Sequence, residues 1–423
     1  MTTAPAAPQT HITPLPPRDW KAPLTLGIFT VLFALLVLIA HRDGETTFRL
    51  ATGSDALTLP DLVVPVRATA WVCIVIAAAF SALAAWYVRG RKKVPLWLVV
   101  VFVIVLVLGF LAWAAAGKTL PIPGLLAGSL GLAVPLIFGA LGGVIGERAG
   151  VVNIAIESQL LGGAFTAAVV ATLTGSPFAG LIAAMVAGAL VGAVLAAFAI
   201  VYFVEQVIIG VVLNVLVTGV TSFLYSQLLQ PNKAMLNTPP RFDRLPIPVL
   251  SDIPIIGPVF FRQTILVYLM YLAIIIVFIA MFYSRWGLRL RAVGEHPTAA
   301  DTVGINVRRT RFLNVVLAGA IAGAGGTVFT VGNGIAFNQE MTAGAGYIAL
   351  AAVIFGQWHP LKATLAALLF GFASNLQNTL KVVGSPVPSE FMLMLPYLVT
   401  IFVVAGVVGH SRAPAASGQP YIK

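Results

Sequence analysis

Residues 158–204 read SQLLGGAFTAAVVATLTGSPFAGLIAAMVAGALVGAVLAAFAIVYFV and contain no Asp, Glu, Lys or Arg. A helix needs about 20 apolar residues to cross the hydrocarbon core of a bilayer. The stretch therefore predicts two successive membrane-spanning helices, Ser158–Thr174 and Pro177–Phe203. Gly188 and Gly192 are one helical turn apart in the second helix, and such small residues predict close packing against another membrane helix.

The rest of the chain has the same character. Of 423 residues, 59% are hydrophobic and 9% are charged, whereas roughly a quarter of the residues in a soluble domain are charged. We therefore predict an all-α, polytopic transmembrane helical bundle of about 10–12 membrane segments. Besides the two named above, the predicted segments are Ala22–Ala40, Ala68–Val88, Pro95–Ala116, Pro123–Gly146, Val207–Leu229, Thr264–Ser284, Phe312–Gly332, Ala345–Phe355, Ala363–Leu380 and Phe391–Gly409.

The positive charge of the chain lies in short loops. The net charge is +11, but the cations are spread between apolar segments, where they indicate topology, and we expect no nucleic-acid partner. Lys and Arg gather in residues 89–93 and 285–311, which we expect in the cytoplasm. The loops 41–67 and 230–263 carry mixed charge and are expected outside. This alternation predicts a multi-pass protein of the cell membrane, surrounded by lipid, with both termini in the cytoplasm.

A polar break interrupts the apolar pattern at Gly146–Glu157, which reads GERAGVVNIAIE. Irregular backbone at membrane depth survives only where protein or a water-lined cavity satisfies it. Asn153 and Glu157 share one face if the segment is helical, and an ionisable group inside a membrane is a functional candidate. The alternative is a short cytoplasmic loop in which Glu157 caps the next helix. The residues alone leave both interpretations open.

A second break at residues 333–347 reads NGIAFNQEMTAGAGY. It leads into Ala345–Phe355, which is too short to cross alone and predicts a re-entrant or broken helix. Interrupted helices in both halves of a chain mark the transport site in carriers built from repeats. The alternative for this segment is a short outer loop. The alternative for the isolated amides in apolar segments is that they only form hydrogen bonds between helices. The candidate substrate-binding residues are the polar groups near the breaks, Asn153, Glu157, Asn214, Asn333, Gln339 and Glu340.

The basic loop 285–311 contains a third candidate segment. Residues 298–303 predict a short helix that begins after Pro297 and stops at Gly304. A rigid helix in a cytoplasmic loop suits docking of a soluble partner, and the alternative is a loop that only fixes topology.

Motifs of catalysis and nucleotide binding are missing from the sequence. The chain has no HExxH or GxSxG motif. Gly117-Lys118-Thr119 resembles the end of a phosphate-binding loop, but Ala112 stands where its first glycine is required. We therefore expect that the chain is not an enzyme and has no ATPase site of its own, so that any ATP chemistry would come from another polypeptide.

Three motifs carry a resemblance to a known family. Gly294–Asp301, GEHPTAAD, resembles the cytoplasmic coupling motif of bacterial ABC-importer permeases. Gly146–Ile154, GERAGVVNI, and the stretch from Met341 to Gly356 resemble the simple-sugar and nucleoside branch of the branched-chain amino acid/ribose permeases. The resemblance covers about residues 121–409. It is closest to the nucleoside sub-branch, because Glu157 stands where sugar permeases are usually more neutral.

The resemblance implies an ABC-importer permease fold with broken helices and an organisation in four parts. Residues 1–21 are expected to be a disordered cytoplasmic leader, residues 22–120 to form N-terminal extra transmembrane helices, and residues 410–423 to be a disordered tail. Residues 121–409 are the expected permease core, with the coupling loop 285–311. The residues that the resemblance assigns to ATPase coupling are Gly294, Glu295, Ala299, Ala300, Asp301 and Gly304.

The implied function is ATP-driven import by alternating access, of nucleosides or simple sugars. The implied partners are a cytoplasmic ABC ATPase, which binds the ATP, a second homologous permease and an extracytoplasmic substrate-binding lipoprotein. No cofactor and no metal is expected on this chain. The alternatives are a permease for branched-chain amino acids and a secondary transporter driven by ions through Glu157 or Glu340.

Overall fold

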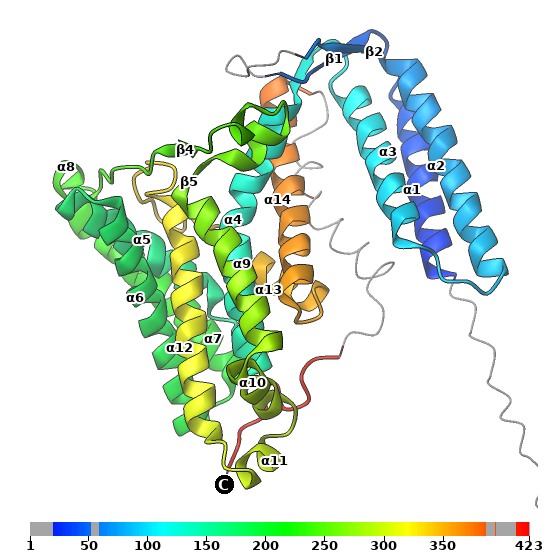
Figure 1. Cartoon of the computed structure of the whole chain (residues 1–423). Coiled ribbons are helices and arrows are strands. Elements are labelled where there is room, and N and C mark those ends of the chain that lie inside the picture. Colours follow the sequence, from blue (N-terminus) through cyan, green and yellow to red (C-terminus); the bar gives the residue numbers. More distant parts are fainter. Residues whose placement is uncertain (1–19, 52–58, 386–393, 395–411, 423) are drawn as a thin grey trace, which may run out of the picture. The chain divides into compact units, whose positions relative to one another are not determined.

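The computed structural model describes residues 20–51, 59–385, 394 and 412–422 (Figure 1). By their internal contacts, these residues form two compact units. The first comprises residues 20–46 and 64–117, and the second comprises the remaining described residues. Among the described residues, nine helices are long and apolar enough to cross a membrane. The prediction of a polytopic all-α membrane protein is confirmed.

The first unit contains α1 (Lys21–Ile39), α2 (Val66–Arg89) and α3 (Leu96–Ala114). The helices approach closely at Gly109, where a Cβ atom would lie 2.7 Å from Cβ of Cys73. At one end of the unit the Arg42 guanidinium stacks 4.0 Å from the ring centre of Trp113 and donates to the carbonyl oxygens of Trp113 and Ala114. This cation therefore joins the chain after α1 to the end of α3.

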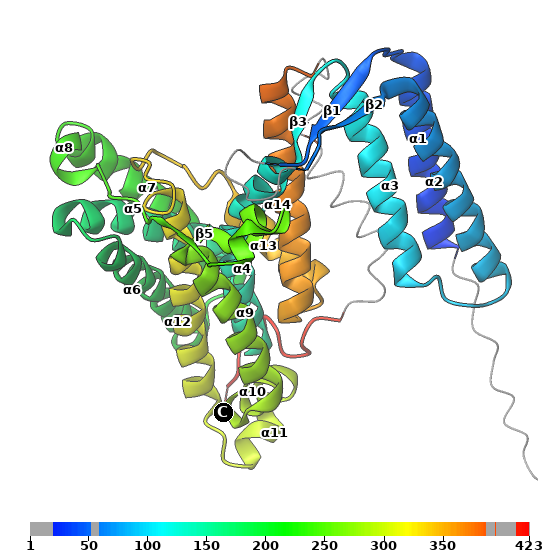
Figure 2. The same cartoon turned by 45° about the horizontal axis from the view of Figure 1, so that its top comes forward.

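The second unit contains the remaining helices and most of the short strands (Figure 2). Its long helices, two of which end in π-helical turns, are α4 (Ile122–Arg148), α5 (Ile156–Thr174), α6 (Pro177–Ala196, then Ala197–Val201), α7 (Gln206–Leu224, then Tyr225–Leu229), α9 (Ile265–Tyr283), α12 (Val307–Gly326) and α14 (Pro360–Val383). Its shorter helices are α8 (Lys233–Leu236), α10 (Arg285–Glu295), α11 (Pro297–Thr302) and α13 (Ala345–Phe355).

Short strands join some of the loops at the helix ends. Residues 47–49 of β1 (Glu45–Arg49) pair in parallel with β3 (Thr119–Pro121). In the loop before α9, β4 (Arg244–Pro246) pairs antiparallel with β5 (Arg262–Thr264). The strand β2 (Leu62–Pro65) completes the set.

Each predicted segment from Ala22 to Leu380 overlaps a helix of the structure, and α13 has the predicted bounds. The predicted last segment, Phe391–Gly409, lies outside the described residues except for residue 394.

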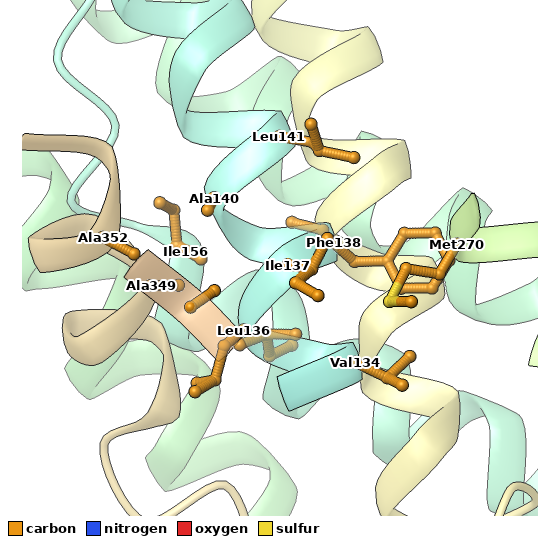
Figure 3. Packing of buried hydrophobic residues seen from close by; sticks show 14 of the residues in the cluster. Val134, Leu136, Ile137, Phe138, Ala140, Leu141, Ile156, Met270, Ala349 and Ala352 are labelled. Atoms are coloured by element: carbon orange, nitrogen blue, oxygen red, sulfur yellow. The ribbon is translucent and has the colours of Figure 1, made fainter. Parts of the chain in front are cut away.

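Backbone contacts between glycines hold the second unit together. Gly188 of α6 packs against the backbone of Gly319 and Gly323 of α12, where a Cβ atom on any of the three would collide with the opposite helix. The close packing predicted at Gly188 and Gly192 is confirmed, since a Cβ atom on Gly192 would also collide, with the Val315 carbonyl of α12. Figure 3 shows part of the apolar core of this unit, in which Ile156 of α5 and Ala349 of α13 lie on one side of α4 and Met270 of α9 lies beside Phe138 on the other.

Candidate transport site and coupling surface

The first polar break lies between the end of α4 and the start of α5. Gly150 has φ of +90°, a conformation that favours glycine and ends the helix. Asn153 is buried before α5 begins, and its side chain exchanges hydrogen bonds of 3.1 and 3.3 Å with the amide of Gln159. The condition under which Asn153 and Glu157 would share a helix face is therefore not met, because only Glu157 is helical.

The carboxylate of Glu157 joins the first break to the second. Its Oε1 accepts hydrogen bonds from the Thr342 hydroxyl at 2.6 Å and the Gly344 N–H at 2.9 Å. Its Oε2 accepts from the Gly346 N–H at 2.6 Å. An anion is favourable at a helix N-terminus, and the helix that it caps here is α13. One interpretation of the sequence was that Glu157 caps the helix that follows it. Glu157 is a capping residue, but the helix that it caps is α13, in the other half of the chain.

The backbone approach at this contact requires a residue without a side chain. A Cβ atom on Gly346 would collide with the backbone of Glu157. The chain enters α13 through Ala343 at φ of +46° and Gly344 at φ of +82°. This sharp turn aims the backbone N–H groups at the carboxylate.

Asn214 of α7 completes the polar cluster around Glu157. Its Oδ1 accepts from the Ser158 N–H at 3.0 Å. Its Nδ2 donates to the Ile154 carbonyl at 3.0 Å and to the Tyr347 hydroxyl at 3.0 Å. Asn214 therefore ties α7 to the starts of both α5 and α13.

The other three candidate substrate residues contact different elements. Asn333 donates to the Val328 carbonyl at 2.8 Å, and Gln339 donates to the Ser222 carbonyl of α7 at 3.3 Å. Both side chains are exposed, as is Glu340, whose φ is +52°. The structure thus brings Glu157 and Asn214 together, with Asn153 in the adjacent break, and leaves the other three outside that cluster.

A cavity of about 1010 Å³ lies beside Asn333. One wall is the glycine face of α4, and Asn375 and Asn378 of α14 contribute amides. Four charged side chains from the loop before α9 also line it, Arg241, Asp243, Arg244 and Arg262. The sequence showed the amides of α14 as isolated polar residues in an apolar segment, but gave no sign that they border a cavity with Asn333.

The other end of α13 contacts the end of α4. The Arg148 guanidinium donates to the Trp358 carbonyl at 3.0 Å, and the Trp358 indole N–H donates to the Glu147 carboxylate. His359 stacks on Phe282 with ring centres 5.0 Å apart. Burial, with the nearby charges of Lys362 and Arg148, lowers the pKa of His359 below its ordinary value.

The predicted short helix of the basic loop is present as α11. Pro297 occupies its first position, and Gly304 follows it at φ of +85°. Ala300 is 3% exposed and packs with Val293 and Val307, whereas Ala299 is exposed.

The residues before α11 bind it to the end of α4. Gly294 packs on the Arg148 carbonyl, where a Cβ atom would collide. Glu295 lies 3.6 Å from the Arg148 guanidinium. Asp301 lines a pocket of about 370 Å³ with Gly304 and the following residues.

The long apolar helices, the half-length α13 and the buried polar breaks define a helical membrane transport protein of the permease class. Residues 125–404 match the family described as the permease component of the branched-chain amino acid transport system. The chain belongs to this family.

Its relatives include permeases whose names state a substrate. The chain is 41% identical to the guanosine ABC transporter permease protein NupQ of Bacillus subtilis over 69% of this chain and 94% of the relative. It is 38% identical to the nucleoside ABC transporter permease protein NupC of Lactococcus lactis, over 68% and 93%. It is 34% identical to the putative glucose ABC transporter permease protein TsgC13 of Haloferax volcanii, over 70% and 97%. No solved structure gives a significant match.

The Glu157→Gln variant tests the contact between the two breaks. A glutamine retains one acceptor oxygen and turns an NH₂ group toward N–H and O–H donors, so at least one buried donor loses its partner. That loss destabilises a fold by about 1–3 kcal/mol. We expect a lower thermal unfolding temperature in detergent and faster hydrogen exchange at Gly344 and Gly346. Glu340→Gln, at an exposed carboxylate, is the matched control and should change neither. Unchanged exchange at both glycines in Glu157→Gln would contradict the assignment.

Proposed function

We propose that the chain is the membrane permease subunit of an ATP-driven importer for nucleosides. The observation that carries the proposal is its identity of 41% and 38% with permeases named for guanosine and nucleosides, over nearly their whole length. Simple sugars are the second candidate, because a relative at 34% identity is named as a putative glucose permease.

The proposed partners are those of the family resemblance. They are a cytoplasmic ABC ATPase, a second homologous permease and an extracytoplasmic substrate-binding lipoprotein. This chain would contribute no ATPase site of its own. Both termini are proposed to be cytoplasmic, which agrees with the contact of the described tail, residues 412–422, with α10 and α11.

The proposed substrate path includes both groups of candidate residues. A nucleoside presents ribose hydroxyls and base edges, which need donors and acceptors in a pocket. The cavity beside Asn333 offers amides next to a glycine wall on which a flat base can lie. Glu157, with Asn153 and Asn214 near it, forms an inner polar layer, and Gln339 and Glu340 belong to the segment that leads to it.

Alternating access needs an element with two arrangements. In the structure the Glu157 carboxylate is satisfied by donors from residues 342–346. Substrate hydroxyls offer the same kind of donor, so exchange of internal donors for substrate donors would release the start of α13. A partner or ligand shifts such an equilibrium only by binding the two states differently.

Uptake measurements test the substrate class. In vesicles that contain the whole complex, we expect ATP-dependent uptake of labelled guanosine or uridine that unlabelled nucleosides inhibit and leucine does not. Glucose uptake without nucleoside uptake would favour the second candidate. Uptake that needs an ion gradient and no ATP would contradict the proposal and favour the secondary-transporter alternative.

The Asn333→Ala variant tests the cavity. Loss of one neutral hydrogen bond to substrate weakens binding by about 0.5–1.5 kcal/mol, which corresponds to about a twofold to tenfold lower affinity. We expect the concentration for half-maximal nucleoside uptake to rise by that factor. Asn232→Ala removes an exposed amide outside the cavity lining and is expected to have no effect. Equal kinetics in both variants would remove Asn333 from the path.

The exposed face of α11 is the proposed ATPase-docking surface. Ala299 is exposed, and Val303 directly after the helix is 75% exposed. We expect Ala299→Trp to lower substrate-stimulated ATP hydrolysis by at least about tenfold, the effect of about 1.4 kcal/mol, without a change in thermal stability. Ala300→Trp should instead lower stability, because that position is packed.

The matched control for Ala299→Trp is Ala234→Trp, at an exposed alanine of α8. Full stimulation of the ATPase by the complex with Ala299→Trp would contradict the docking surface.

A further inference from the structure

The tail of residues 412–422 is bound to the second unit, although its composition predicts disorder. The Ala416 N–H donates to the Gly294 carbonyl at 2.9 Å, and the Gly418 N–H donates to the Gly150 carbonyl at 3.3 Å. The Ala415 N–H donates to the Glu295 carboxylate at 3.2 Å. Figure 1 draws this tail in red beside α10 and α11.

A buried cation holds the tail from the other side. Arg311 of α12 is 2% exposed. Its guanidinium donates to the Gln419 carbonyl at 2.7 Å and to the Ala416 carbonyl at 3.4 Å. A buried guanidinium needs acceptors for its donors, and the tail supplies them through backbone carbonyls. The expectation of a disordered tail is thus corrected for residues 412–422.

Gly150, in the first polar break, leaves the space that the Arg311 guanidinium occupies. A Cβ atom on Gly150 would lie 2.7 Å from Nη2 of Arg311. Gly150 also accepts from the tail, so one glycine between α4 and α5 contacts both partners.

The tail contacts the buried face of α11, the proposed coupling helix. Tyr421 packs against the small apolar cluster of Val293, Ala300 and Val307. Ala300 is the inward-facing residue of α11, and Tyr421 also lines the pocket beside Gly304 and Arg308. The tail therefore contacts α10, α11, α12 and the end of α4 within eleven residues, 412–422.

We propose that the tail is a positioning strap for α11. It fixes the coupling helix to α4 and α12, so that a displacement of α11 by the ATPase moves these membrane helices instead of only the loop 285–311. Arg311 is the positioning residue that anchors the strap. The inference rests on the proposed coupling role of α11.

The test compares a chain that ends at residue 411 with the full chain, in the complete complex reconstituted in vesicles. We expect the ATPase to copurify with the shortened chain and basal ATP hydrolysis to persist. Substrate-stimulated hydrolysis and uptake should fall by about tenfold or more, the change that loss of hydrogen bonds to a charged group produces. A peptide of residues 412–423, added to the shortened chain, should restore stimulation.

Arg311→Gln tests the anchor, and Arg309→Gln, at an exposed arginine of the same helix, is its control. We expect Arg311→Gln to lower the ratio of substrate transported to ATP hydrolysed, without rescue by the peptide, and Arg309→Gln to leave the ratio unchanged. Should Arg311→Gln fail to fold, the shortened chain and its rescue still decide the matter.

Full stimulation of hydrolysis by the shortened chain would overturn the strap. Loss of ATPase copurification would overturn it too, because the tail would then be part of the docking surface. The Ala299→Trp variant separates this inference from the proposed function. If Ala299→Trp abolishes stimulation and the shortened chain retains it, only the strap is wrong. If Ala299→Trp has no effect, the coupling role of α11 fails.

Discussion

The carboxylate of Glu157, with its three hydrogen bonds from residues 342–346, is the interaction on which the arrangement of the second unit depends. A helix of eleven residues cannot span a bilayer, and the irregular chain before it has backbone groups that lipid cannot satisfy. Glu157 satisfies the first N–H groups of this segment with charge, which gives stronger hydrogen bonds than a neutral acceptor. The two breaks, one in each half of the chain, therefore stabilise each other through this contact.

Close backbone packing supplies the rest of the stability. Lipid removes most of the hydrophobic driving force between helices, so association depends on van der Waals contact and on polar groups. The contact of Gly188 with Gly319 and Gly323 brings α6 and α12 together at backbone distance.

The helices could be predicted because their signal is local. Runs without charge gave segments that overlap the observed helices, and Pro297 and Gly304 placed α11 to within one residue of each observed bound. Glu157 was recognised as an unusual residue, but its partners were not, because they are 185 to 189 positions away and two of them are backbone N–H groups. The tail was misjudged for a related reason. Its acceptors for Arg311 are carbonyl oxygens, which every residue carries and no sequence pattern reveals.

Arg148 contacts both the turn after α13 and the segment before α11, through the Trp358 carbonyl and the Glu295 carboxylate. The short helix α13 is thus held at both ends. The Glu157 carboxylate binds its start, and the Arg148 guanidinium binds the turn that follows its end. A short helix that is held at both ends is hindered from rotating about either end. The contact after its end, through Arg148, is shared with the segment that leads into α11. A displacement of that segment would therefore be transmitted through Arg148 and along α13 to the polar cluster around Glu157. The surrounding long helices would not need to bend.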